Sequence, residues 1–276
     1  MFWALLITFL LTQRKKMDFT LRIYRKLLTG LLHKEYHFLT FEQYCQTPAD
    51  QLPKRFIILR HDVDLKAKNS LVTAQIEHEL GICASYYFRV VPESNQPDII
   101  RAIAAFGHEI GYHYEDMAIM HGDTEKALAH FQQQLAYFRQ YYPVTTICMH
   151  GAPTSKWDGR ELWKHYDYHE YGIVGEPYFD VDFSQMFYLT DTGRRWDGYK
   201  VSVRDKIPLY QDQWTAQGLV YRRTQQIVRA AQNEQLPARI MITTHPQRWT
   251  NKPLSWAKEL IMQSLKNAIK RLFLVK

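Results

Sequence analysis

Two aspartates that follow an apolar run near residue 60 are the first candidates for chemistry. Residues 56–59 are all apolar, as in a buried strand, and the next five residues include Arg60, Asp62 and Asp64. Parallel sheets present reactive groups at the carboxyl ends of their strands. Two carboxylates in one dry site do not readily ionise together, whereas a metal ion that holds one of them leaves the other free to act as a base.

Histidines end three further strand-like runs in the same way. These runs end at residues 112, 149 and 244 and are followed by His113, His150 and His245. Aspartate and neutral histidine with an open water position suit a divalent metal of the zinc type. Such a metal activates water near neutral pH and polarises a carbonyl, so these residue types favour hydrolysis of an amide or ester.

Strand and helix patterns alternate along the chain and must position these groups. We expect strands over residues 56–59, 82–91, 108–113, 145–149 and 240–244, and helices over residues 19–33, 66–80, 97–106, 123–142, 218–235 and 255–274. The first of these helices is amphipathic, and residues 157–217 are the least regular part. The alternation predicts an α/β fold with a parallel sheet, either open or closed as a (β/α) barrel. The barrel better explains functional groups that converge from distant strands.

Composition and motifs exclude several classes of protein. The chain has 276 residues, 46% of them hydrophobic and 23% charged, which is typical of a folded domain and not of a disordered chain. The net charge is +7, but the sequence shows no nucleic-acid-binding motif, so we expect no nucleic-acid partner. It also contains no GxGxxG after the first strand and no GxxxxGK[ST], which disfavours nucleotide-phosphate binding. The three cysteines show no CxxC spacing, which favours a reducing compartment.

The first sixteen residues differ from the rest. Residues 1–11 are almost wholly apolar and residues 14–16 are basic, an order unlike that of a secretory signal. The apolar run is too short for a transmembrane helix. We expect residues 1–16 to be an upstream extension, with Met17 as the physiological start and residues 17–276 as a single cytoplasmic domain. The alternative is a short anchor at the inner membrane face, and only then would the protein contact a membrane.

The motifs resemble those of a known family. Residues 61–64 (HDVD), 107–113 (GHEIGYH) and 244–246 (THP) are similar to successive motifs of the polysaccharide-deacetylase (NodB-like) family, carbohydrate esterase family 4. The resemblance covers roughly residues 55–250. It implies a distorted (β/α) barrel and a hydrolase acting on carbon–nitrogen (non-peptide) bonds. The implied reaction removes an acetyl group from an N-acetylated sugar or glycoconjugate precursor with a bound divalent metal of the zinc type.

The resemblance also implies a role for individual residues. Asp62 matches the catalytic base, Asp64 the metal carboxylate, and His113 the first metal histidine. His245 matches the histidine that protonates the leaving amine. The sequence departs from the family four residues after His113, where Met117 replaces the second metal histidine. It departs again at residues 149–153, which replace the family's arginine-and-proline motif.

The third metal ligand and the substrate contacts therefore stay open. Glu115 and His150 are equal candidates for the ligand, with His121 behind them. The candidates for substrate contact are Arg60, Trp249 and Arg194. Trp249 could form the floor of a sugar subsite, whereas Arg194 could equally lie in a solvated loop.

Two other functions and one purely structural interpretation remain possible at this point. The methionine at position 117 also fits a metal-independent hydrolase of other C–N bonds on the same barrel, or a catalytically silent carbohydrate-binding barrel. In the simplest alternative, each strand-end histidine is only a hydrogen-bonded structural residue, and Asp62 and Asp64 cap the next helix.

Overall fold

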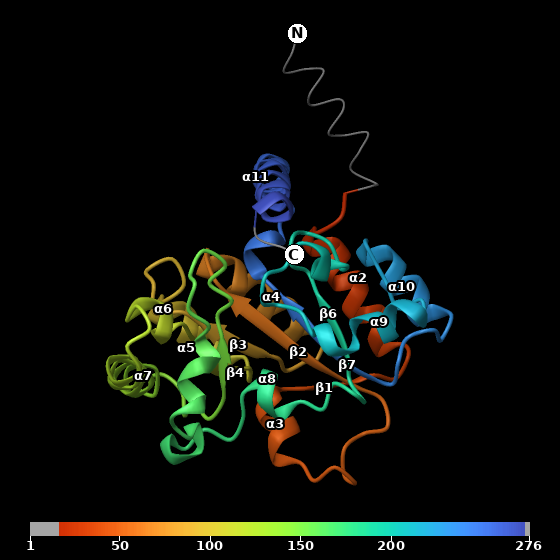
Figure 1. The fold of residues 1–276 in the computed structure, drawn as a ribbon. Coiled ribbons are helices and arrows are strands. Elements are labelled where there is room, and N and C mark those ends of the chain that lie inside the picture. The colour runs from red at the N-terminus through yellow and green to blue at the C-terminus, as the bar shows by residue number, and fades with distance from the viewer. Residues whose placement is uncertain (1–16, 274–276) are drawn as a thin grey trace.

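The computed structural model describes residues 17–273 and contains one parallel sheet of seven strands (Figure 1). The expectations for residues 1–16 lie outside the described part. The strands are β1 (His37–Leu39), β2 (Phe56–Val63), β3 (Ser85–Phe88), β4 (Glu109–Tyr114), β5 (Ile147–Met149), β6 (Phe187–Thr190) and β7 (Arg239–Thr244). Their order is β5-β4-β3-β2-β7-β6, and β1 pairs with the first half of β2.

The sheet curls into a half-barrel with β2 at its centre (Figure 1). Every ladder between the described strands is parallel. Strands β5 and β6 form the two edges of the sheet and do not pair with each other among residues 17–273. The protein is therefore a mixed α/β fold, and its curled sheet is compatible with a distorted β/α barrel.

Most of the longer helices lie where the sequence pattern predicts. The longer helices are α2 (Leu21–Leu32), α4 (Ala67–Glu79), α5 (Pro97–Ala105), α7 (Thr124–Phe138), α9 (Pro208–Ala216), α10 (Thr224–Gln232) and α11 (Pro253–Phe273). The predicted amphipathic first helix is confirmed, because α2 buries Tyr24, Leu27, Leu28 and Leu31. Asp123 caps α7 by accepting a hydrogen bond from the Lys126 N–H at 3.1 Å. Among residues 17–273, no helix is both long and apolar enough to cross a membrane.

Several predicted boundaries were wrong. Helix α7 ends at Phe138 instead of residue 142, and the predicted helix over residues 218–235 begins only at Thr224. The irregular region contains strand β6, the short helix α8 (Pro177–Asp180) and the 3₁₀ helices η1 (Gly159–Lys164), η2 (Tyr168–Tyr171) and η3 (Gly198–Lys200). Strand β1 and helix α3 (Phe41–Gln46) were also missed. These elements are too short to show a clear periodicity.

Strand β2 is buried along its whole length, and its two faces have different partners. Successive side chains of a strand point to opposite faces, so His61 lies on the face opposite to Arg60 and Asp62. There His61 Nε2 lies 2.9 Å from the buried Glu77 carboxylate, and His61 Nδ1 lies 2.6 Å from the Thr244 hydroxyl. His61 is thus held in a buried polar network beneath helix α4, away from the carboxylates that follow it in the sequence.

Candidate functional site

The predicted strand-end residues converge on one cavity of about 90 Å³ at the carboxyl edge of the sheet. It is lined by Asp62, Asp64, His113, Met149, His150, Gly151, Pro153, Tyr178, Thr192, Ser202, Val203, Arg204, Asp205, His245, Arg248 and Lys270. Five of these residues were predicted from strand ends: Asp62, Asp64, His113, His150 and His245. They lie at the ends of β2, β4, β5 and β7, which the parallel register brings to one edge. The helix-capping alternative does not hold, because α4 begins at Ala67 and its N terminus has no side-chain cap hydrogen bond.

Asp64 and two histidines offer three atoms suited to a cation. Asp64 Oδ1 is buried, has no hydrogen-bond partner among the described residues, and lies 3.6 Å from Nε2 of both His113 and His150. His113 Nδ1 lies 2.9 Å from the Cys148 carbonyl, and His150 Nδ1 lies 2.8 Å from the Glu115 carboxylate. Because both partners accept hydrogen bonds, each Nδ1 carries the proton and each Nε2 keeps its lone pair.

A second group of ligand atoms lies beside the first. Oxygen, nitrogen and sulfur atoms of Asp62, His113 and Cys148 lie within 4.8 Å of one another, and this buried triad could hold a metal ion. However, both Asp62 oxygens already accept hydrogen bonds from Arg60, each at 2.9 Å. Burial also raises the pKa of the Cys148 thiol well above its usual value, which opposes formation of the thiolate that a metal needs. The atoms around Asp64 therefore fit a cation better.

Arg60 and Asp62 form a buried, bidentate ion pair on one face of β2. Their side chains are 1% and 5% exposed, so the pair is shielded from water. Burial disfavours the guanidinium charge, but Asp62 raises the pKa of Arg60 well above its usual value. Asp62 Oδ2 also lies 3.8 Å from His113 Nε2. The carboxylate thus stands beside the candidate cation position, where it can accept a proton from a water molecule.

Histidine 245 is held by an aspartate that the sequence analysis missed. His245 Nδ1 donates to Asp191 Oδ1 at 2.7 Å, and the His245 N–H donates to Asp191 Oδ2 at 3.0 Å. Burial and the nearby Arg248 cation lower the pKa of His245, but Asp191 and Asp64 outweigh them, so this pKa is raised above 6.5. His245 Nε2 faces Asp64 Oδ2 at 3.8 Å. The imidazole is therefore suited to deliver a proton into the cavity.

Asp191 could have been found from the sequence. It follows the apolar strand β6 directly, just as Asp62, His113 and His245 lie at the ends of other strands. Residues 186–189 are recognisably apolar, but they were not predicted to be a strand of the sheet because the surrounding sequence is irregular.

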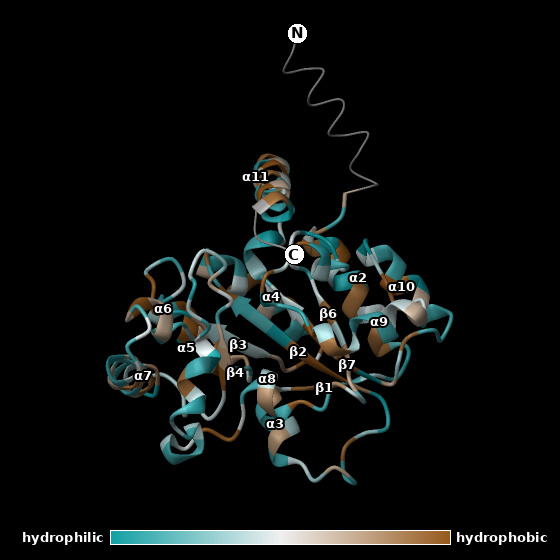
Figure 2. Ribbon diagram, viewed as in Figure 1, coloured by the Kyte–Doolittle hydropathy of each residue, from teal (hydrophilic) through white to brown (hydrophobic). Residues whose placement is uncertain are grey.

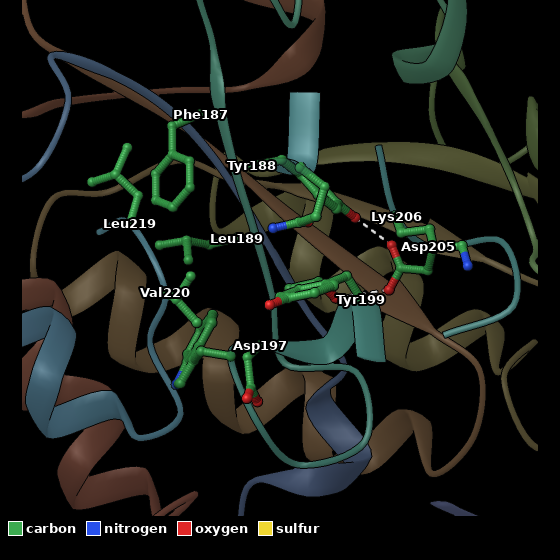
Figure 3. A pocket seen from close by; sticks show the side chains of 12 residues that line it. Phe187, Tyr188, Leu189, Asp197, Tyr199, Asp205, Lys206, Leu219 and Val220 are labelled. Carbon is green, nitrogen blue, oxygen red and sulfur yellow. Dashed lines mark hydrogen bonds between the residues drawn. The ribbon is translucent and has the colours of Figure 1, made fainter. Parts of the chain in front are cut away.

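Asp205 is another carboxylate at the edge of the cavity, outside the strand-end pattern. It accepts hydrogen bonds from the hydroxyl groups of Tyr188, Thr190 and Thr192, the Thr190 bond being 2.7 Å long. Figure 3 shows the bond from Tyr188, seen in a neighbouring pocket that Asp205 also lines. Burial raises the pKa of Asp205, but His245, Arg60 and these hydroxyl groups lower it to about 2. No strand ends at Asp205, so the strand-end pattern could not have located it.

The three residues predicted to contact the substrate lie outside the cavity. Trp249 is only 1% exposed and packs in the core against Phe19 and Tyr24, at centroid distances of 5.1 and 5.0 Å. Arg194 donates to the Trp256 carbonyl at 2.9 Å, and Arg60 is bound to Asp62. None of the three predicted contact residues lines the cavity.

The three candidates for the third ligand occupy different places. Of these, only His150 lines the cavity. Glu115 binds His150 and Arg89, with Arg89 Nε donating to Glu115 Oε1 at 2.7 Å, so it orients a ligand candidate. His121 is exposed, and Met117 is buried in the core at 3% exposure.

The most specific part of the family-like motif, residues 107–111, has structural partners. His108 Nδ1 accepts a hydrogen bond from the Ala84 N–H at 3.1 Å, and Glu109 accepts one from the Ser85 hydroxyl at 2.6 Å. A Cβ on Gly111 would lie 2.3 Å from Tyr87 Cε1, so only glycine fits beneath that ring. These residues build the sheet that carries His113.

Comparison of the chain with protein-family models, with curated proteins and with solved structures found no match. The candidate function therefore depends on the residues around the cavity and on their geometry.

Proposed function

We propose that this protein is a metal-dependent hydrolase that removes an acetyl group from an N-acetylated saccharide or glycoconjugate precursor. The observation that carries the proposal is the buried Asp64 Oδ1, which has no hydrogen-bond partner among the described residues and lies 3.6 Å from Nε2 of His113 and of His150. An unsatisfied buried carboxylate oxygen is costly, and a cation shared with two imidazoles would satisfy it.

Each residue around this position then has a distinct task. A divalent cation of the zinc type, when bound by Asp64, His113 and His150, would act as a Lewis acid toward the acetyl carbonyl. Asp62, held by Arg60, accepts the proton of the attacking water. His245, held by Asp191, donates its Nε2 proton to the departing nitrogen. The products are acetate and a free amine.

The resemblance to the polysaccharide-deacetylase family supports the same proposal. The curled parallel sheet is compatible with the distorted barrel of that family, and the HDVD, GHEIGYH and THP motifs occur in the family's order. The departure at Met117 does not leave the site short of a ligand, because His150 brings a second imidazole from β5. We therefore propose a branch of this family in which the second metal histidine comes from another strand.

The first experiment is metal analysis together with an acetate-release assay. We expect about one divalent ion per chain in protein purified without chelator, and acetate release from a member of a panel of N-acetylated saccharides. Asp62→Asn and His245→Ala should each lower kcat by about 100-fold or more while the metal is retained.

Matched controls come from the exposed pair Asp167 and His169, which lies outside the cavity. Asp167→Asn and His169→Ala should leave both metal content and activity unchanged. Acetate release that persists at the full rate in metal-free protein, or in the Asp62→Asn variant, would overturn the proposal.

A further inference from the structure

Helix α11 turns its polar side toward the protein. The Asn267 amide donates to the Gly193 carbonyl at 2.9 Å, Glu259 pairs with Lys66 at 3.2 Å, and Gln263 is only 7% exposed. A surface helix of a soluble protein normally packs its apolar side inward instead. The orientation of α11 therefore leaves its apolar side uncovered by the described part of the chain.

The outer side of α11 concentrates the exposed apolar residues of the molecule. Twelve large apolar side chains are exposed in the described part of the chain, and seven of them lie on α11. These are Leu254, Leu260, Ile261, Met262, Leu265, Ile269 and Leu272, with exposures from 39% to 76%. Figure 2 shows the apolar colour along α11, where the helix stands clear of the rest of the fold. A contiguous patch of this kind marks an interaction surface.

The charge of α11 indicates what covers this patch. Three basic residues of the helix, Lys258, Lys266 and Arg271, are exposed, whereas Lys270 lines the cavity. Its single acidic residue is the Glu259 that pairs with Lys66. A second copy of the chain would bring like charges together. An apolar stripe flanked by lysine and arginine instead matches a bilayer with anionic headgroups.

We propose that the outer side of α11 is a docking surface for an anionic lipid bilayer. Lys270, in the last turn of α11, also lines the cavity at the edge of the sheet. Attachment through α11 thus brings the cavity close to the bilayer, where a lipid-linked saccharide can reach it. That consequence rests on the proposed function, but the attachment itself does not.

Co-sedimentation of the full chain with vesicles tests the attachment without any activity assay. We expect the protein to bind vesicles of equal parts phosphatidylglycerol and phosphatidylcholine, and to bind phosphatidylcholine alone much more weakly. Ile261→Gln with Leu265→Gln should weaken binding by about 100-fold or more, since each side chain loses roughly tenfold. Lys258→Glu with Lys266→Glu should weaken it by at least about 30-fold at low salt.

Controls separate the lipid surface from the other possible occupants. Leu209→Gln changes a leucine that is 80% exposed on α9 and should leave binding unchanged. Failure to bind anionic vesicles would overturn the proposal, as would binding that the α11 variants leave unchanged. A homodimer that the α11 variants dissociate, with no vesicle binding, would identify a second copy as the occupant and also overturn it.

Discussion

Replacing Asp191 by asparagine tests how the protein tunes His245. Asp191 accepts hydrogen bonds from His245 Nδ1 at 2.7 Å, from Arg248 at 2.5 Å and from the Trp249 indole N–H at 2.8 Å. Asparagine keeps the size of the side chain but removes the negative charge and one of the two acceptors. The variant therefore separates the charge of Asp191 from its space-filling role.

The sign and size of the effect follow from the contacts of His245. In the native protein, burial and Arg248 lower the pKa of His245, while Asp191 and Asp64 raise it above 6.5. A contacting opposite charge shifts a pKa by about 1–3 units, or roughly 1.4–4 kcal/mol. Without Asp191, burial and an unpaired Arg248 still lower the pKa of His245 and only Asp64 still raises it, so we expect this pKa to fall.

This change can be measured without knowing the substrate. The His245 ring resonance is assigned by its loss in a His245→Gln spectrum and then titrated by NMR in both proteins. Asp167→Asn removes an exposed carboxylate that lies 2.7 Å from His169 and should leave the His245 titration unchanged. Once a substrate is known, the alkaline limb of kcat/KM should move to lower pH by the same amount, because the protonated imidazole is the active form.

The stability of the protein should follow the same titration. A histidine whose folded pKa is raised contributes stability that is fully present below pH 6.5 and is lost as the pH rises through the folded pKa. Asp191→Asn should remove this contribution. A His245 pKa that stays raised in the variant would refute the assignment of Asp191 as its cause.

Three further predictions test the metal ligands, a buried carboxylate and a motif glycine. His150→Ala should weaken zinc binding by about 100-fold or more in calorimetric titrations, whereas Cys148→Ser should change it by less than about threefold. The reverse order would assign the metal to the group of Asp62, His113 and Cys148. Asp205→Asn should lower the free energy of urea unfolding at pH 6 by ~2 kcal/mol, because the pKa of Asp205 is held near 2 instead of 3.8. This contribution is lost as the pH falls from 3.8 through 2. A difference between the two proteins that stays constant down to pH 2 would contradict the reasoning. Gly111→Ala should lower the unfolding free energy by about 1–3 kcal/mol by pressing on the Tyr87 ring, and Tyr87→Leu in the same protein should recover part of the loss if the clash is the cause.

The sequence by itself determined the main elements and their meeting point. Asp62, Asp64, His113, His150 and His245 could be placed at one edge of a sheet because each follows or ends an apolar strand and parallel strands share their carboxyl edge. The helix periodicity likewise predicted which side of α2 is buried. These features depend on local patterns that a short stretch of chain carries in full.

Only the tertiary structure decided which partner each polar group has. The lone pair on His150 Nε2 depends on the hydrogen bond of Nδ1 to Glu115, which lies 35 positions away in the sequence. The hydrogen bond between Asp191 and His245 joins residues 54 positions apart. Hydrogen bonds of this kind depend on where the backbone carries each side chain, and hydrophobic periodicity does not encode that.

The tertiary structure also overruled two expectations drawn from residue type. Trp249 was predicted to line a subsite, but it is buried because α2 and the segment that leads into it bring Tyr24 and Phe19 against its ring. The apolar residues of α11 would ordinarily face the core, but Asn267 and Glu259 hold the polar side of the helix inward. In both cases the residue type indicated burial or contact with a ligand. The position of the neighbouring elements decided whether the side chain lies in the core or on the surface.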